Sequence, residues 1–185
     1  MDLVVKAATP ERWEDLRLFF GPNGAYSNCW CTWWRLSNAE FSAQSPQGRR
    51  RLLEGLVSAG PAPGLLAYRG EELVGWMSLG GRDGFPRLQR SPKLKPIDDL
   101  PVCSIVCFFI HRDHRREGVA GALLDAAVPH AARAGFSLLE GYPIDTAATK
   151  KGPADLYMGT LEFFEDHGFE EVERRGGRPV VRKAV

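Results

Sequence analysis

The chain has 185 residues, and its 24 lysines and arginines nearly balance its 23 aspartates and glutamates. This length suits one domain that buries a substantial core, and a net charge near zero gives no field that would recruit nucleic acid or an anionic membrane. The first residues are too few and too acidic for a signal peptide, and no apolar run reaches membrane-spanning length. We therefore expect a cytoplasmic protein that binds neither nucleic acid nor membrane.

The first third of the chain predicts a strand followed by two helices. Residues 3–7 form the strand, and Thr9-Pro10-Glu11 supplies the cap, first-turn proline and acid that begin a helix reaching Phe20. A second helix is predicted from Pro46 to Ala59. Between the two helices lies a segment rich in aromatic residues, Asn28 to Leu36.

The middle of the chain predicts a hairpin, a long loop and a buried strand. Two apolar runs, 65–68 and 73–78, flank a turn at Gly70 and predict an antiparallel hairpin. Residues 80–100 show no periodicity and contain several prolines and glycines, which predicts a loop. Residues 101–110 are apolar at both alternating sets of positions, so we expect a strand buried on both faces in the centre of a sheet.

The last third predicts two helices that alternate with strands. An amphipathic helix from Gly118 to Arg133 is followed by a strand at 136–140, and the helical crossover makes this strand parallel to its predecessor. A further helix is predicted from Tyr157 to His167. Residues 169–174 and 180–183 are expected to form a closing antiparallel pair.

The most informative stretch joins the buried strand to the next helix. The apolar run stops at Ile110, a short basic turn follows, and Arg115, Gly118 and Ala120 form an Arg-x-x-Gly-x-Ala step. The first-turn amides of such a helix are unpaired and carry the positive end of its dipole, so this loop suits a phosphate. Its spacing is that of neither the Rossmann motif nor the P-loop. It closely resembles the pyrophosphate loop of the GNAT superfamily of N-acetyltransferases, with Arg112 in place of the usual proline.

The resemblance extends to the order of elements along the whole chain, and it implies the GNAT fold. That is an α+β (α/β-like) fold with a mixed central sheet of six to seven strands and about four flanking helices. Residues 1–185 would form a single acetyltransferase domain, with residues 1–60 on the acceptor side and residues 101–134 as the CoA-binding strand, loop and helix. Coenzyme A would bind where two parallel central strands splay apart.

The resemblance also implies which residues hold acetyl-CoA as a co-substrate. Phe108, Phe109 and Ile110 would pair with the pantetheine arm through the exposed edge of their strand. The pyrophosphate would meet the loop, where Gly118 and Ala120 leave room for its oxygens. The cofactor-binding set is completed by the other loop residues and two residues of the late helix: Arg115, Arg116, Glu117, Val119, Gly121, Thr160 and Phe164.

Acyl transfer to an amine needs one group that removes a proton from the ammonium and another that protonates the departing thiolate. Glu140 is the candidate base, since it ends the parallel strand and ligands bind at that end of such strands. The alternative interpretation of this residue is a strand-end carboxylate that faces water.

The candidate acid is less clearly defined, because Phe164 occupies the position where the family usually has a tyrosine. Phenylalanine cannot donate a proton, and Tyr157, seven residues earlier on the predicted helix, would lie roughly 10 Å away. Three alternatives stay open: water protonates the thiolate, Tyr142 does so, or the protein does not catalyse. Tyr157 is expected to contact the cofactor or the acceptor.

The aromatic segment is the candidate acceptor site, because the resemblance places the region between the first two helices over the acceptor groove. Trp30, Trp33 and Trp34 offer apolar walls or a cation–π contact for an ammonium. Arg35 suits a carboxylate or phosphate on the acceptor. The alternative is that the tryptophans are core residues that anchor a helix pair to the sheet.

The four cysteines are interpreted as free thiols. Cys103 and Cys107 lie inside the apolar strand, where a thiol behaves as a small hydrophobe, and neither has an adjacent base that would make it a covalent acyl carrier. Cys29 and Cys31 are too close for an easy disulfide and are off the usual zinc spacing. We therefore expect no metal.

Together these features predict an acetyl-CoA-dependent N-acetyltransferase that acts by direct transfer in a ternary complex. The acceptor is expected to be a primary amine of a small molecule or a peptide, and its identity does not follow from the sequence. A homodimer is compatible with this interpretation. The alternative function, which Phe164 favours, is a non-catalytic acyl-CoA-binding regulatory module.

Overall fold

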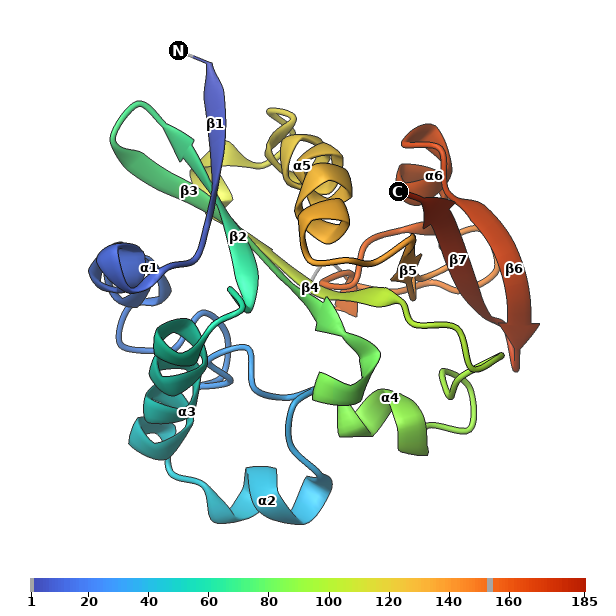
Figure 1. The fold of residues 1–185 in the computed structure, drawn as a ribbon, viewed down its shortest axis with the longest axis horizontal. Coiled ribbons are helices and arrows are strands. Elements are labelled where there is room, and N and C mark those ends of the chain that lie inside the picture. Colours follow the sequence, from blue (N-terminus) through green and yellow to red (C-terminus); the bar gives the residue numbers. More distant parts are fainter. Residues whose placement is uncertain (1, 153–154) are drawn as a thin grey trace.

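The computed structural model describes residues 2–152 and 155–185, and its centre is a seven-stranded mixed sheet in the order β1-β2-β3-β4-β5-β7-β6 (Figure 1). Neighbouring strands are antiparallel except for β4 and β5, which are parallel as the sequence predicts. The strands are β1 (Leu3–Ala7), β2 (Gly64–Arg69), β3 (Glu72–Gly81), β4 (Cys103–Ile110), β5 (Leu138–Gly141), β6 (Glu170–Arg175) and β7 (Arg178–Ala184).

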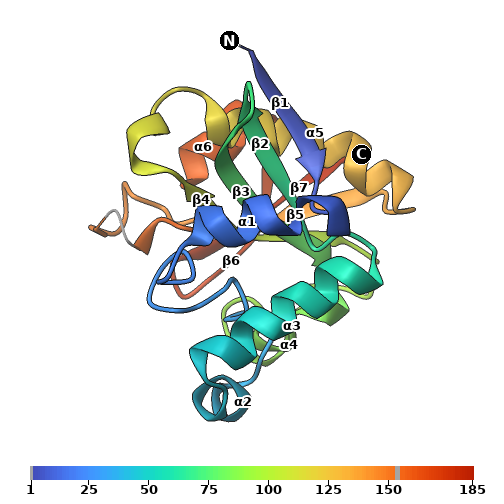
Figure 2. The ribbon, with the colours of Figure 1, turned by 90° about the vertical axis from the view of Figure 1, so that its left-hand side faces the viewer.

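Helices cover both faces of this sheet. Helices α1 and α3 lie on one face and α5 lies on the other (Figure 2). The helices are α1 (Trp13–Phe20), α2 (Asn38–Ala43), α3 (Pro46–Ala59), α4 (Pro86–Arg90), α5 (Val119–Arg133) and α6 (Leu161–Asp166), with 3-10 turns at Pro10–Arg12, Arg82–Gly84 and Arg112–His114. The mixed sheet with its flanking helices is the fold that the sequence predicts.

Local sequence explains the elements whose bounds were predicted correctly. Strand β1 and helix α3 have the predicted limits. Helix α3 starts where expected because Ser45 Oγ accepts a hydrogen bond of 3.0 Å from the Gly48 amide, and because Pro46 occupies the first helical position.

The other strands and the first helix differ from the expectation by a few residues at their ends, and three elements differ more. Residues 80–100 contain the short helix α4, which Pro86 begins at its first helical position. Helix α2 was not predicted, and it begins with a capping box formed by Ser37 and Glu40. The late helix starts at Leu161 rather than at Tyr157, because Gly159 has a φ of 82° and Thr160 is an extended N-cap. Tyr157 therefore lies in a turn before α6 and not on a helical face.

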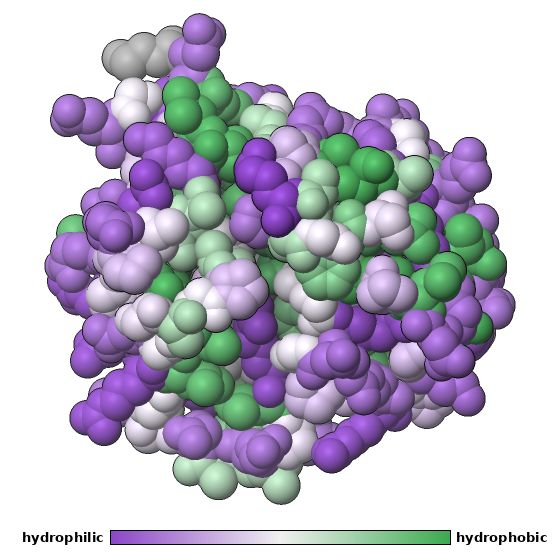
Figure 3. Space-filling model, viewed as in Figure 1, coloured by the Kyte–Doolittle hydropathy of each residue, from purple (hydrophilic) through white to green (hydrophobic). Residues whose placement is uncertain are grey.

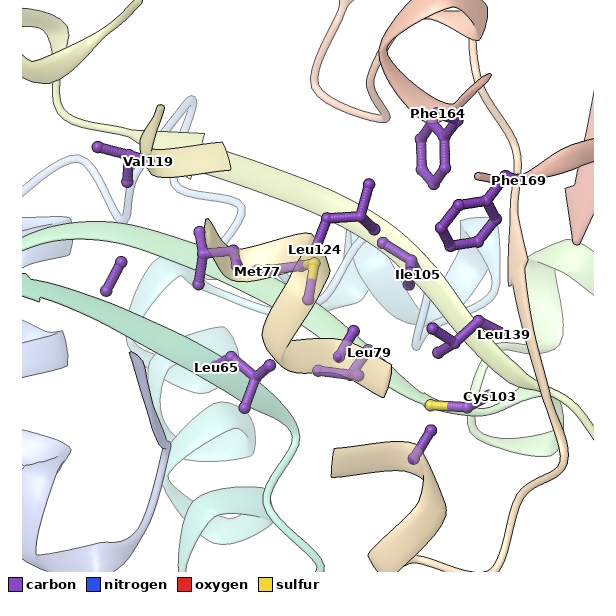
Figure 4. Packing of buried hydrophobic residues seen from close by; sticks show 14 of the residues in the cluster. Leu65, Met77, Leu79, Cys103, Ile105, Val119, Leu124, Leu139, Phe164 and Phe169 are labelled. Carbon is purple, nitrogen blue, oxygen red and sulfur yellow. The ribbon is translucent and has the colours of Figure 1, made fainter. Parts of the chain in front are cut away.

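The core is divided by the sheet into layers. On the α5 side, the helix buries Val119, Leu123 and Ala127 against β2, β3 and β4. Figure 4 shows this layer, in which Phe164 and Phe169 lie beside each other at the end near Leu139. The opposite layer packs α1 and α3 against the sheet around a buried Trp76 on β3. Strand β4 contributes to both layers, which confirms that it is buried on both faces at the centre of the sheet.

The parallel pair β4 and β5 is short, and this creates a gap in the sheet. Pairing covers only residues 103–105 of β4 and 139–141 of β5. Strand β4 continues to Ile110, so its last five residues extend past the end of β5. This edge is where the sequence predicts the pantetheine arm.

The face seen in Figure 3 intersperses apolar patches with hydrophilic side chains, as is usual for a protein surface in water. Among the described residues, no helix combines the length and the apolar character that crossing a membrane would require.

Candidate active site

The loop between β4 and α5 presents backbone amides at the start of a long helix. Gly118 is the N-cap of α5, with a left-handed φ of 78°, and a Cβ built on it would have no heavy atom within 4 Å. Arg116 is also left-handed, with a φ of 65°. The first-turn amides of α5 have no partner within the helix and face this open space, which gives the loop the geometry of an anion site.

Charged residues around the loop are held by local contacts. Arg115 Nε donates a hydrogen bond of 3.4 Å to the carbonyl oxygen of Ile110. Glu117 forms an ion pair with Arg69 at 3.0 Å, and its carboxylate lies 3.2 Å from His114 Nδ1. The Arg69 pair neutralises the carboxylate between Arg116 and the N-terminus of α5, so the loop keeps the positive character that a diphosphate requires.

Two residues in the first turn of α5, Val119 and Gly121, have packing roles beside the loop. Val119 is buried in the core, so only its backbone faces the loop. A Cβ on Gly121 would lie 2.8 Å from His167 Nε2, which means that glycine lets the end of α6 approach the first turn of α5. Helix α5 thus begins next to Gly118, as the sequence predicts, and the structure adds a packing reason for Gly121.

The free edge of β4 is partly occupied by a neighbouring segment. The Phe108 amide donates a hydrogen bond of 2.6 Å to the carbonyl oxygen of Tyr157. Thr160, which was expected to contact the cofactor, caps α6 by accepting a hydrogen bond from the Phe163 amide. The turn that contains Tyr157 therefore lies beside the edge where the pantetheine arm is expected.

An apolar pocket of about 310 Å³ opens next to this edge. It brings together residues from three distant parts of the chain: the aromatic segment, β4 and the turn before α6. Its lining consists of Ala25, Tyr26, Ser27, Cys29, Cys31, Trp33, Trp34, Phe41, Cys107, Phe108, Phe109 and Tyr157. The predicted acceptor residues Trp33 and Trp34 thus meet the predicted cofactor residues Phe108 and Phe109 in one cavity.

The wall of the pocket that precedes Trp33 has an unusual backbone. Five non-glycine residues between positions 25 and 31 have a positive φ: Ala25, Ser27, Asn28, Trp30 and Cys31. Such conformations cost energy and cluster at ligand sites, where the surrounding packing maintains them. The irregular backbone lets Cys29 and Cys31 both line the cavity, although they are separated by one residue.

Tyr157 is the one candidate catalytic residue that lines the pocket. Its side chain is 37% exposed, and burial of its ring raises the pKa of the hydroxyl to about 12. The group is therefore protonated at neutral pH and can donate a hydrogen bond or a proton into the cavity.

Glu140 lies away from the pocket, in a buried network of charges. Both carboxylate oxygens accept hydrogen bonds of 2.7 Å from Arg82, and one also accepts a 2.7 Å bond from Arg182. Only 1% of Glu140 is exposed. This corrects the expectation that the carboxylate faces the ligand side, because both its oxygens are already paired with guanidinium groups.

Tyr142 belongs to the same network. Its hydroxyl donates a hydrogen bond of 2.7 Å to Glu140 and lies 2.8 Å from Ser104 Oγ. The side chain is fully buried, and this burial raises the pKa of the hydroxyl well above its ordinary range. Tyr142 is thus not placed where it could protonate a thiolate in the pocket.

Three other predicted site residues also lie elsewhere. Phe164 is fully buried in the α5-side core, where a Cβ on Gly141 would lie 2.5 Å from its ring (Figure 4). Trp30 is a core residue packed against Phe20. Arg35 donates to the carbonyl oxygens of Pro63 at 3.1 Å and of Leu79 at 3.4 Å. These placements correct the expected contacts of Phe164 with the cofactor and of Trp30 and Arg35 with the acceptor.

Three of the thiols, those of Cys29, Cys31 and Cys103, have a pKa above the ordinary range. Burial raises the pKa of Cys29 to about 11 and that of Cys103 to about 12. Cys31 lies with its sulfur 3.7 Å from that of Cys107 and accepts a hydrogen bond from the Trp76 indole. Within residues 2–152 and 155–185, no three histidine, cysteine, aspartate or glutamate side chains come together in a way that could hold a metal.

A sequence model for the acetyltransferase (GNAT) family matches residues 30–150, which include most of the aromatic segment and all of β4, the loop and α5. The chain belongs to this family. This GNAT protein is accordingly an acyltransferase. A search among curated proteins finds no match to it.

Solved structures support the same fold at low sequence identity. A GNAT-family acetyltransferase from Streptococcus pneumoniae is 14% identical with a TM-score of 0.55, over 100% of this chain and 99% of the other. An N-acetyltransferase from Thermoplasma acidophilum, solved in complex with coenzyme A, is 13% identical with a TM-score of 0.53 over 100% of both chains. A mosquito arylalkylamine N-acetyltransferase-like protein is 10% identical with a TM-score of 0.60, over 100% of both chains.

Sequence reasoning missed several residues of the pocket in this GNAT protein. Tyr26, Phe41 and Cys107 line the cavity but lie in segments without periodicity or in a strand that looks uniformly apolar. The sequence did contain a signal for the environment of Glu140. A carboxylate within a buried strand requires a cationic partner, which predicts an ion pair in the interior.

Proposed function

We propose that this protein transfers an acetyl group from acetyl-CoA to a primary amine of a small molecule or peptide, by direct transfer in a ternary complex. The observation that carries the proposal is the meeting of two features on β4. The anion-binding loop follows its last residue, Ile110, and the aromatic pocket is lined by Cys107, Phe108 and Phe109. A cofactor laid along this edge would reach from the loop to the pocket.

The residues around the loop fit the cofactor. The open space beside Gly118 would receive the pyrophosphate, and the amides of residues 116–121 would bind its oxygens, with Arg115 and Arg116 near them. The edge of β4 from Phe108 to Ile110 would hold the pantetheine arm. Bound acetyl-CoA supplies an acetyl group activated as a thioester.

The chain's own residues would bind the acceptor and move protons. Trp33 and Trp34 would orient the acceptor in the pocket, and the pocket's apolar lining would exclude water. Tyr157 would donate a proton from its hydroxyl to the departing thiolate. It would thereby take the role of the tyrosine that the family usually has at the position of Phe164. Glu140 would act as a positioning residue, since its pairs with Arg82 and Arg182 fix the end of β5.

A matched pair of glycine variants tests the cofactor site. Gly118 and Gly135 lie at opposite ends of α5, both have a left-handed φ, and neither would place a Cβ within 4 Å of another heavy atom. The backbone strain of a valine is therefore similar at both positions. Calorimetry is expected to show that Gly118→Val lowers acetyl-CoA affinity by at least about tenfold, because two methyl groups displace one amide–phosphate contact.

The Gly135→Val control is expected to bind acetyl-CoA like the parent protein. Equal affinities for the two variants and the parent would show that the pyrophosphate does not bind at this loop. Release of free CoA thiol in the presence of an amine panel then distinguishes catalysis from the non-catalytic acyl-CoA-binding alternative, in which binding persists but no thiol appears.

A further inference from the structure

The described residues of the aromatic pocket provide no negative charge for an ammonium. Of the described residues that line it, none carries a charged side chain. A cation that enters such a cavity loses its hydration without gaining a counter-ion. Among the lining residues that the structure describes there is also no carboxylate or imidazole that could take up a proton, and Glu140 is buried in its own network.

The outer side of the pocket wall already carries positive charge. The Arg87 guanidinium lies over the ring of Trp33 at 3.5 Å from its centroid, and that of Arg49 lies over Phe41 at 3.8 Å. Backbone carbonyls fix both groups: Arg87 donates to Ser37, and Arg49 donates to Phe41 at 2.7 Å. The two rings are thus already in cation–π contact with arginines that do not line the pocket, which makes a further cation next to them unfavourable.

A second cavity of about 380 Å³ adjoins the pocket and has the opposite chemistry. The two cavities share Trp34 and Tyr157 as lining residues. The second cavity, here called the basic groove, is also lined by Lys93, Lys151 and Arg178. Its one lining carboxylate, Asp145, is paired with Arg174 at 2.7 Å, so the groove keeps a net positive charge.

Two residues that line the basic groove carry buried donors without partners, and one of them, Trp34, also lines the aromatic pocket. Within the described part of the chain, the Trp34 indole N–H and the Arg178 Nε–H have no hydrogen-bond acceptor. Buried donors in a folded protein normally have a hydrogen-bond acceptor, so an oxygen atom of a ligand would accept hydrogen bonds from these groups.

From these observations, and on the basis of the proposed acetyltransferase function, we infer that the acceptor is an arylamine with an acidic group. Its uncharged amino group and ring would occupy the aromatic pocket beside Phe108, and its carboxylate or phosphate would lie in the basic groove near Lys93, Lys151 and Arg178. The amino group of an arylamine is neutral at physiological pH, so it needs neither a counter-ion nor a strong base in the pocket.

Four compounds separate the two parts of this inference: 4-aminobenzoate, aniline, 4-(aminomethyl)benzoate and benzylamine. Binding is followed by quenching of tryptophan fluorescence, with and without CoA, and turnover is followed by acetyl-CoA-dependent thiol release. A homologous series with longer spacers, from 4-aminophenylacetate to 4-(4-aminophenyl)butyrate, varies the distance between the amino group and the acidic group. The best acidic arylamine is expected to bind at least about tenfold more tightly than aniline, as one charge-assisted hydrogen bond would produce.

Lysine variants locate the acidic group. The double variant Lys93→Gln with Lys151→Gln is expected to abolish the advantage of the acidic arylamine over aniline and to leave aniline binding unchanged. Lys6→Gln on β1 is the control, since this lysine lies over Tyr68 and lines neither cavity. It is expected to change neither the advantage of the acidic arylamine nor the binding of aniline.

The outcomes are distinct for the two proposals. Preference for 4-(aminomethyl)benzoate over 4-aminobenzoate, equal binding of aniline and every acidic arylamine, or an unchanged preference in the lysine variant would overturn the acceptor inference. Failure of acetyl-CoA binding in calorimetry, with arylamine acids still bound, would instead refute the proposed function and leave the specificity of the pocket supported.

Discussion

Replacing Glu140 with glutamine removes the one negative charge that both Arg82 and Arg182 contact in the interior. The side chains of Arg82 and Glu140 are 8% and 2% exposed, so the lost pairing is not replaced by water. Arg182 keeps its ion pair with Asp98, with hydrogen bonds of 2.6 and 2.9 Å. Arg82 keeps only a 3.3 Å hydrogen bond to the Asp98 carbonyl oxygen.

Removing one partner of a buried ion pair costs about 3–5 kcal/mol of unfolding free energy. In a domain of this size each kcal/mol lowers the melting temperature by about 2–4 °C, so Glu140→Gln is expected to lower it by roughly 6–20 °C. Thermal melts followed by circular dichroism measure the shift. Tyr142→Phe, which removes the hydrogen bonds of this hydroxyl with the same carboxylate and with Ser104, is the milder control, with an expected cost of about 1.5–3 kcal/mol.

A double variant tests whether the loss comes from the unpaired arginine. Glu140→Leu with Arg82→Met removes both charges, and the two changes together are expected to be less destabilising than the sum of the single changes by about 2 kcal/mol. One result would refute this reasoning: a Glu140→Gln protein that melts within about 2 °C of the parent but has a kcat about 10²-fold lower. Glu140 would then be the general base.

Three further predictions concern the pocket and the core. Tyr157→Phe is expected to lower kcat by about 10²-fold without changing acetyl-CoA affinity, whereas Tyr26→Phe, at the exposed rim of the same pocket, changes kcat little; equal kcat values for the two variants would contradict the acid role. Phe164→Tyr is expected to lower stability by about 1–3 kcal/mol without raising the rate, because the hydroxyl would enter the core beside Gly141; a faster enzyme would show that this position reaches the thioester. Because burial raises the pKa of Cys29 to about 11, its alkylation by iodoacetamide is expected to be slow at pH 7.5 and to accelerate by about tenfold per pH unit towards pH 11; fast, pH-independent labelling in peptide mass spectra would contradict this.

Much of the fold could be predicted because its signals are local. The limits of α3 follow from Ser45 and Pro46, and the double-sided burial of β4 follows from its uninterrupted apolar sequence. Helix α4 escaped prediction because five residues provide too little periodicity for a pattern to appear. Tyr157 was placed on a helix because nothing in the sequence around Gly159 distinguishes a helical glycine from one with a positive φ.

The candidate site could be predicted only in part, because its chemistry depends on contacts between distant residues. The loop at Gly118 was recognisable from spacing alone. The environment of Glu140 was not, since Arg82 and Arg182 are 58 and 42 residues away in the sequence. A strand position specifies which end of the sheet a carboxylate is near, whereas its partners determine whether it can accept a proton.

The hydrogen bond between the Phe108 amide and the Tyr157 carbonyl has a consequence for the kinetics. A pantetheine arm that pairs with this edge of β4 must take over the Phe108 amide, which releases the turn that carries Tyr157. Because Tyr157 lines both the aromatic pocket and the basic groove, its release changes the shape of both cavities. We therefore expect a compulsory order of addition, with acetyl-CoA first and the amine second. Initial-rate patterns with a dead-end acceptor analogue would show this order as uncompetitive inhibition against acetyl-CoA.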